Sequence, residues 1–143
     1  MKQIKEVTGE CLCGDISYKI IGNLSEGIYC HCTQCRKTSG HFGAFISVKI
    51  KHLLFMSKTN LQWYKSSKNA KRGFCNNCGS SLFWQPKHQK YIAIAAGSIN
   101  KPCIITMREH IFTSDAGDYY RLSDDLKKSN QDANDHWLDN KEI

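Results

Sequence analysis

Apolar and polar residues alternate along several short segments of the chain. The alternation has a period of two residues over 46–50, over 91–95 and, more weakly, over 16–20. This period is typical of half-buried strands. Apolar and β-branched runs bounded by Gly, Asn, Ser or Pro predict further strands over 61–64, 82–84 and 104–107. Because no long amphipathic helix is evident before residue 113, the pattern predicts an all-β domain of several small sheets.

The end of the chain has a different pattern. Two segments, 123–128 and 132–138, favour short helical turns, and the polar stretch between them favours a loop. A chain of 143 residues with 41% hydrophobic content has enough apolar residues for one core. We therefore expect one globular domain over residues 1–126, followed by a polar, acidic tail over residues 127–143.

The eight cysteines are the most informative residues of the composition. The first nine residues hold no apolar stretch like that of a signal peptide, and no run in the sequence is long enough to cross a membrane. We therefore expect a cytoplasmic protein, in which thiols stay reduced. Under those conditions cysteines at these spacings indicate metal ligands more than disulfides.

Seven of the cysteines form three groups with short internal spacings. The first group is Cys11 and Cys13, and the last is Cys75 and Cys78. Each ends in a cysteine followed by glycine, a residue that permits the positive φ of a sharp turn. Zinc in structural sites takes four ligands in a tetrahedron, and two such turns supply four sulfurs. The spacing therefore predicts a structural zinc site formed by Cys11, Cys13, Cys75 and Cys78, an arrangement associated with about 10–16 kcal/mol of apparent binding free energy in small zinc peptides.

The middle group has three cysteines, Cys30, Cys32 and Cys35, in one short loop. No other cysteine pair remains to complete this site, so three thiolates would leave one coordination position open. An open position distinguishes catalytic from structural zinc, since a substrate atom can bind there. We therefore predict a second, catalytic zinc ion on this loop.

Three residues are alternative fourth ligands for that site. They are His31, His41 and Cys103. His31 stands between two ligands, so its side chain is expected to point away from the shared metal. Cys103 follows Pro102 in a strand-like run and is expected to be a core thiol.

Basic residues surround the cysteine groups. Residues 1–113 hold sixteen Lys and Arg against five Asp and Glu, a net charge of +11, whereas residues 114–143 carry −4. Arg36 and Arg72 stand out, because a guanidinium can bind a carboxylate bidentately or hydrogen-bond a metal loop. The nearby lysines fit a solvated face equally well. Phe42 and Phe45 follow the three-cysteine loop and are expected either to wall a pocket or to pack in the core.

Taken in order, these motifs resemble those of the glutathione-dependent formaldehyde-activating family, which also includes centromere protein V-like proteins. The resemblance runs from Gly9 to about Leu126. Its carriers are Gly9–Gly14 with Tyr18, Cys30–Gly40, Arg72–Leu82, Ala96–Ile99 and His110–Phe112. Asn100 and the pair Tyr119–Tyr120 depart from the family pattern, at positions where Asp and a Trp-aromatic pair are usual.

The resemblance implies a fold, a metal content and an activity. The fold would be a β-tent of small coiled antiparallel sheets stabilised by zinc. The metals would be two zinc ions held by the two cysteine sets named above. The activity would be that of a carbon–sulfur lyase that joins glutathione with formaldehyde to give S-hydroxymethylglutathione. From the chemistry of their side chains, we expect Arg36 and Arg72 to contact the carboxylates of the small-molecule thiol.

Two other functions fit parts of the sequence. The glycine-tailed cysteine pairs and the basic body are also typical of a zinc-ribbon-like module that binds nucleic acid or protein without catalysis. A ribbon needs only four cysteines, however, so it leaves the three-cysteine loop unexplained. The other possibility is an inactive partner-binding domain that retains only the structural zinc.

Overall fold

The computed structural model describes residues 6–24 and 26–130, and β-strands dominate this part of the chain. The strands are β1 (Glu6–Glu10), β2 (Ile16–Ile21), β3 (Gly27–Cys30), β4 (Gly43–Lys49), β5 (Leu53–Lys58), β6 (Leu61–Ser67), β7 (Ala70–Cys75), β8 (Ser81–Pro86), β9 (Tyr91–Ala95), β10 (Met107–Ile111) and β11 (Lys127–Lys128). One α-helix, α1 (Thr33–Ser39), and the 3-10 turns η1 (Ile50–His52), η2 (Ala96–Ser98) and η3 (Thr113–Asp115) complete the described elements. The predicted all-β fold of several sheets is confirmed.

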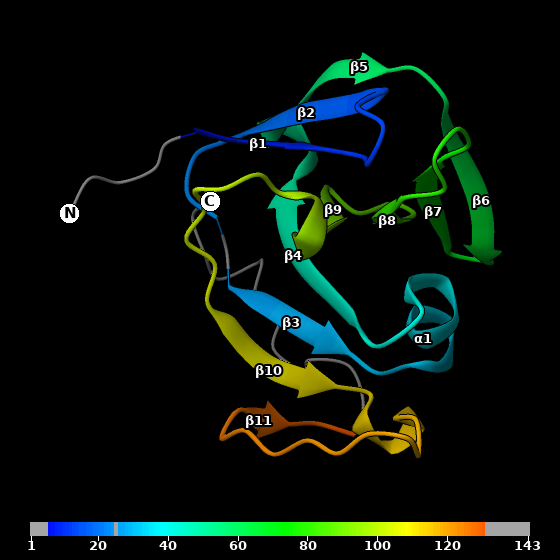
Figure 1. The fold of residues 1–143 in the computed structure, drawn as a ribbon, viewed down its shortest axis with the longest axis vertical. Coiled ribbons are helices and arrows are strands. Elements are labelled where there is room, and N and C mark those ends of the chain that lie inside the picture. The colour runs from blue at the N-terminus through cyan, green and yellow to red at the C-terminus, as the bar shows by residue number, and fades with distance from the viewer. Residues whose placement is uncertain (1–5, 25, 131–143) are drawn as a thin grey trace.

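The strands form two sheets. β1, β2 and β5 form an antiparallel sheet, and the other eight follow the order β11-β10-β3-β4-β9-β8-β7-β6. Within the larger sheet β10 runs parallel to both β3 and β11. Figure 1 shows the three-stranded sheet at one end of the molecule and β3, β10 and β11 at the other, with the long strand β4 running between them.

Two expected elements are corrected. Residues 104–106 are not a strand, because the ladder with β3 starts where Met107 faces Gly27, the first residue of β3. The helical turn expected over 123–128 is also wrong. The Asp124 carboxylate accepts a hydrogen bond from the Leu126 amide at 3.1 Å. Such a local bond competes with helix formation, and Lys127–Lys128 instead form β11 beside β10. The segment 132–138 lies outside the described residues, and the domain boundary at residue 126 stays a prediction.

The helix α1 owes both of its ends to specific residues. At its start, the Cys32 sulfur accepts a hydrogen bond from the Cys35 amide at 3.3 Å, which occupies one of the free amides of the first turn. At its end, Gly40 adopts a φ of 76° and its amide donates to the Arg36 carbonyl. The helix is therefore fixed directly after β3, and this position brings Cys30, Cys32 and Cys35 together.

The main core lies between the two sheets. Its largest fully buried side chains include Tyr18 from β2, Phe83 from β8 and Ile94 from β9. A second, smaller apolar cluster contains Cys30, Cys35, Phe45, Ala93 and Ile111. This second cluster therefore includes two cysteines of the three-cysteine loop and packs against that loop.

No helix in the described ranges, 6–24 and 26–130, is long and apolar enough to cross a membrane.

Candidate metal centres and pocket

The first and third cysteine groups meet, as their spacing predicts. The sulfurs of Cys11, Cys13, Cys75 and Cys78 all lie within 4.8 Å of one another. The Cys13 sulfur is 3.6 Å from that of Cys11 and 3.7 Å from that of Cys75. Four sulfurs converging in this way match the donor set of a closed tetrahedral zinc site.

Glycines and amide hydrogen bonds shape both turns of this cluster. Gly14 and Gly79 have φ values of 82° and 80°, in the left-handed region that favours glycine. Their amides donate to the carbonyls of Cys11 and Cys75 at 3.1 and 2.8 Å. The Ile16 amide also donates to the Cys11 sulfur at 3.3 Å. The backbone therefore holds the sulfurs in place from both turns.

Ser80 is a member of this cluster that the sequence interpretation did not single out. Its hydroxyl accepts a hydrogen bond from the Leu12 amide at 3.0 Å and lies 3.2 Å from the Cys78 sulfur. The hydrogen bond from the Ser80 hydroxyl lowers the pKa of Cys78 to about 5. Ser80 thus links the two turns and favours the thiolate that a metal requires.

The three cysteines of the middle group also converge. The sulfurs of Cys30, Cys32 and Cys35 lie within 4.8 Å of one another, and within the described ranges no histidine, carboxylate or further cysteine joins them. Hydrogen bonds from the Cys30 and Cys35 thiols lower the pKa of Cys32 to about 2, whereas the bond to Cys32 raises the pKa of Cys30. The donor set fits a soft metal ion with one position left for a substrate atom.

The alternative fourth ligands lie elsewhere. The His41 ring nitrogen Nδ1 is 2.6 Å from the Tyr119 hydroxyl, and the side chain is exposed. Cys103, expected to be a buried core thiol, is half-buried and packs against the main core. His31 is completely buried and points away from the three sulfurs, toward Tyr120 and His110. Its orientation agrees with the sequence prediction.

His31 belongs to a chain of hydrogen bonds behind the three-cysteine loop. Its Nε2 lies 2.8 Å from Nδ1 of His110, and its Nδ1 lies 2.6 Å from the Tyr120 hydroxyl. His110 in turn donates from Nε2 to the Asp124 carboxylate at 2.9 Å. Burial lowers the pKa of His31 to about 4, so its imidazole is neutral at pH 7. The chain connects the loop to β10 and to the segment before β11.

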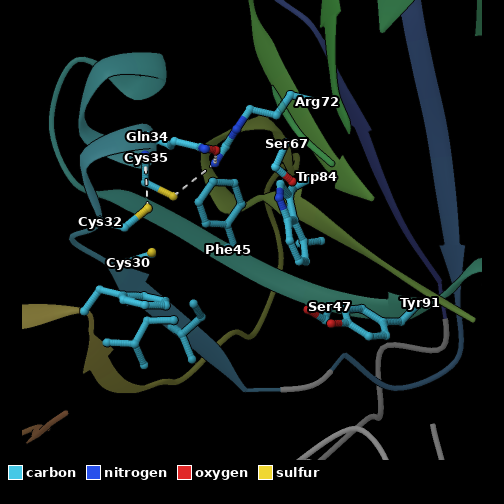
Figure 2. A pocket seen from close by; sticks show the side chains of 14 residues that line it. Cys30, Cys32, Gln34, Cys35, Phe45, Ser47, Ser67, Arg72, Trp84 and Tyr91 are labelled. Carbon is cyan, nitrogen blue, oxygen red and sulfur yellow. Dashed lines mark hydrogen bonds between the residues drawn. The ribbon is translucent and has the colours of Figure 1, made fainter. Parts of the chain in front are cut away.

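A pocket of about 290 Å³ opens beside the three sulfurs. Figure 2 shows the sulfurs on one side of the pocket and Ser47 with Tyr91 on the other. Its lining is mostly apolar, and the residues are Ile28, Cys30, Cys32, Gln34, Cys35, Phe45, Ser47, Ser67, Arg72, Trp84, Tyr91, Ala93, Ile111 and Phe112.

Strand register explains why distant residues share this pocket. Arg72 of β7 faces Trp84 of β8, Trp84 faces Ala93 of β9, and Ala93 faces Ser47 of β4. Paired residues in neighbouring strands project on the same face of a sheet. This row of four residues therefore forms one wall, and Phe45 lies two residues before Ser47 on the same face.

The two predicted arginines have different positions. Arg72 is 6% exposed and lines the pocket, and its Nη2 lies 3.6 Å from the Cys35 sulfur and 3.4 Å from Oε1 of Gln34 (Figure 2). Its Nε is buried and has no hydrogen-bond partner among the residues that the structure describes. Arg36 does not line the pocket, and its Nε donates to the Asp115 carbonyl at 2.9 Å. Arg72 is therefore the better placed of the two to meet a ligand.

Comparison with known proteins agrees with this geometry. The family model for the glutathione-dependent formaldehyde-activating enzyme matches residues 6–115. The chain belongs to this family. The matched span includes both cysteine clusters, every residue that lines the pocket, and His110.

Among proteins similar to this chain, two are informative. One is described as an uncharacterized lyase of Schizosaccharomyces pombe, which is 36% identical over 80 residues, or 55% of this chain. The match spans 57% of that relative's length. The other is a crystal structure of a Rhodobacter sphaeroides protein, with a TM-score of 0.56 and 19% identity over 68% of this chain and 90% of that one. The crystal structure shows the fold alone. The family model shows the family, and the yeast protein's name is that of a lyase.

Several pocket residues were missed from the sequence. Gln34, Ser47, Ser67, Trp84 and Tyr91 were not predicted to contribute to a site. Gln34 lies within the three-cysteine motif, which was a usable signal. The others could be placed only with the register of four strands, which the sequence does not supply.

Proposed function

We propose that the chain is a zinc-dependent carbon–sulfur lyase that joins a small thiol of the glutathione type with a small aldehyde. With glutathione and formaldehyde the product is S-hydroxymethylglutathione. The observation that carries the proposal is the three-sulfur cluster, which has no fourth protein ligand among the described residues and opens onto a pocket. A purely structural site has no need for such an opening.

The proposed metal content is one structural and one catalytic zinc ion. Cys11, Cys13, Cys75 and Cys78 would hold the first, and Cys30, Cys32 and Cys35 the second. Zinc in the three-sulfur site supplies Lewis acidity, which lowers the pKa of a thiol that binds beside it.

The chain's own residues position the reactants. The aromatic and aliphatic side chains of the pocket exclude water from the reacting groups. Arg72 stands next to the Cys35 sulfur, where its guanidinium can hold one carboxylate of the thiol. In the reaction a bond forms between the thiol sulfur and the carbonyl carbon, and the thiol proton is transferred to the carbonyl oxygen. The reverse reaction cleaves the same bond, as a lyase does.

The test is the variant Cys32→Ser, with Cys103→Ser as its matched control. Cys32 belongs to the three-sulfur cluster, whereas Cys103 packs against the core outside both clusters. We expect Cys32→Ser to lose one equivalent of zinc by metal analysis and to exchange the adduct with free thiol and aldehyde at the uncatalysed rate by NMR exchange spectroscopy. Cys103→Ser should retain both properties. Full turnover in Cys32→Ser after loss of that zinc would defeat the proposal.

A further inference from the structure

The pocket is much larger than formaldehyde requires. Formaldehyde has two heavy atoms and no side chain, and a single water molecule takes up about 30 Å³ in the liquid. A pocket of about 290 Å³ therefore has space for a substituent in addition to the thiol sulfur and the carbon and oxygen of the aldehyde. The pocket is also continuous with the three sulfurs, because Cys30, Cys32 and Cys35 are part of its lining.

The space away from the sulfurs is lined mainly by apolar and aromatic side chains, with the hydroxyls of Ser47 and Ser67 among them. Phe45 is 8% exposed and Ala93 is 7% exposed, and both belong to the smaller apolar cluster. Trp84 packs against this cluster, and its ring centroid lies 6.5 Å from that of Tyr91. Ile28 faces Phe45 across the β3–β4 ladder and closes the same wall. Surfaces of this kind bind hydrocarbon groups and leave the charged parts of a ligand unsolvated.

The charge in the pocket is confined to the sulfur end. Arg72 is the one Lys or Arg among the lining residues, and no Asp or Glu is among them. Within residues 6–24 and 26–130, its buried Nε has no hydrogen-bond partner. A single guanidinium next to Cys35 can satisfy one carboxylate, but nothing in the lining pairs with a ligand ammonium group. The charged ends of a peptide thiol are therefore better accommodated outside the apolar part of the pocket.

We propose that the aldehyde partner of this reaction carries an apolar substituent, either an aromatic ring or a branched aliphatic group, which occupies the space between Phe45, Trp84 and Tyr91. This inference rests on the lyase activity proposed above and specifies its substrate. The thiol sulfur and the carbonyl carbon meet at the three-cysteine end, and the polar part of the thiol extends toward solvent. The bond that forms is again sulfur to carbon, the proton moves from sulfur to the carbonyl oxygen, and no electron donor or acceptor is needed.

The first test measures binding with two stable thioethers and the zinc-loaded protein. S-benzylglutathione has the sulfur, carbon and ring of a benzaldehyde adduct, whereas S-methylglutathione has only the carbon of a formaldehyde adduct. Neither carries the hydroxyl group needed for cleavage. By isothermal titration calorimetry we expect S-benzylglutathione to bind at least tenfold more tightly, with a more negative heat-capacity change from the buried ring. Equal affinities, tighter binding of the methyl compound, or no binding of either would overturn the inference.

Variants of Trp84 test whether the pocket causes the preference for S-benzylglutathione. Trp84→Ala removes an aromatic wall, and we expect the ratio of the two affinities to fall about tenfold. Trp84→Phe should recover most of the ratio. Met56→Ala changes a residue that is 61% exposed on β5, in the other sheet, and should have the ratio of the parent protein. An unchanged ratio in a folded Trp84→Ala would contradict the proposed position of the ring. If Trp84→Ala does not fold, the affinities of the parent protein for the two thioethers test the proposal by themselves.

Turnover separates the two proposals. The exchange of the benzaldehyde and formaldehyde adducts of glutathione is measured by NMR on the same protein. If the formaldehyde adduct turns over and the benzyl group gives no gain in affinity, the substrate inference fails and the lyase proposal stands. If the benzyl compound is preferred and neither adduct turns over, the lyase proposal fails and the pocket preference stands.

Discussion

At the scale of single residues, Arg72 combines deep burial with incomplete pairing. A guanidinium that is 6% exposed would usually be matched by a carboxylate. Among the described residues its contacts are a sulfur at 3.6 Å and an amide oxygen at 3.4 Å, both long for strong hydrogen bonds. Two roles fit this position: Arg72 could balance the charge of the thiolates, or it could bind a carboxylate of the substrate.

The variant Arg72→Met distinguishes these roles. If Arg72 binds a carboxylate, kcat/KM should fall about tenfold or more for thioglycolate, and much less for 2-mercaptoethanol, which has no carboxylate. Arg72→Lys should recover only part of the loss, because an ammonium cannot form the bidentate contact. An equal loss with both thiols would instead assign Arg72 to the thiolates. Zinc content, measured on each variant, shows whether the metal site is intact.

Tyr18 is the second informative residue, because it is a fully buried phenol in the core between the sheets. Its hydroxyl lies 2.6 Å from that of Ser98, and its ring covers Gly9, where an added Cβ would lie 2.2 Å from the ring. Burial raises the pKa of Tyr18 from 10 to about 12. The folded state therefore binds the phenol proton more tightly than the unfolded state does.

This shift predicts a specific loss of stability in alkali. The contribution is fully present below pH 10 and is lost as the pH rises through about 12, and it amounts to roughly 2–3 kcal/mol. Tyr18→Phe should be less stable at pH 8 by about 1 kcal/mol because it loses the hydrogen bond, but its stability should fall less steeply between pH 10 and 12. Denaturant unfolding at a series of pH values checks this. Tyr64→Phe, at an exposed tyrosine, should follow the parent curve.

At the scale of elements, the alternation of apolar and polar residues predicted strands well but did not show which strands pair with one another. The run over 91–95 is β9, and the runs over 16–20 and 61–64 lie within β2 and β6. The cysteines within each group converge as their spacing predicts, because local contacts hold each turn: glycine turns at Gly14 and Gly79, and an amide–sulfur hydrogen bond from Cys35 to Cys32. Local chemistry is readable in a sequence, whereas the pairing of strands is not.

Apart from Gln34 and Ser80, which stand beside the cysteines in the sequence, the missed features depend on contacts between distant segments. The pocket wall requires β7, β8, β9 and β4 to align in one register. The hydrogen-bond chain requires Asp124 to reach His110, which depends on the parallel pairing of β11 with β10. No periodicity in the sequence encodes these alignments. Tyr120, the second residue of the pair that stands where the family pattern usually has a Trp-aromatic pair, contributes the hydroxyl that meets His31.

At the scale of the whole molecule, the two clusters have different roles in stability. The four-sulfur cluster joins the end of β1 to the turn after β7, and so connects the three-stranded sheet to the larger one. Cys75 is fully buried within the main core. The three-sulfur cluster lies within one segment, from the end of β3 to α1, and closes no long loop. The first cluster should therefore govern folding, and the second should govern reactivity.

This difference predicts opposite results for two cysteine variants. An apparent binding free energy of about 10–16 kcal/mol for a structural zinc site is as large as the whole stability of a typical domain, which is about 5–15 kcal/mol. Cys75→Ser should therefore lose cooperative thermal unfolding, whereas Cys32→Ser should keep it with a modest decrease in Tm. Circular dichroism with parallel metal analysis makes the comparison, and a chelator should remove zinc from the three-sulfur site first, because its open position admits a competing ligand. If Cys75→Ser and Cys32→Ser were equally stable, both sites would contribute equally to folding, and this prediction would be wrong.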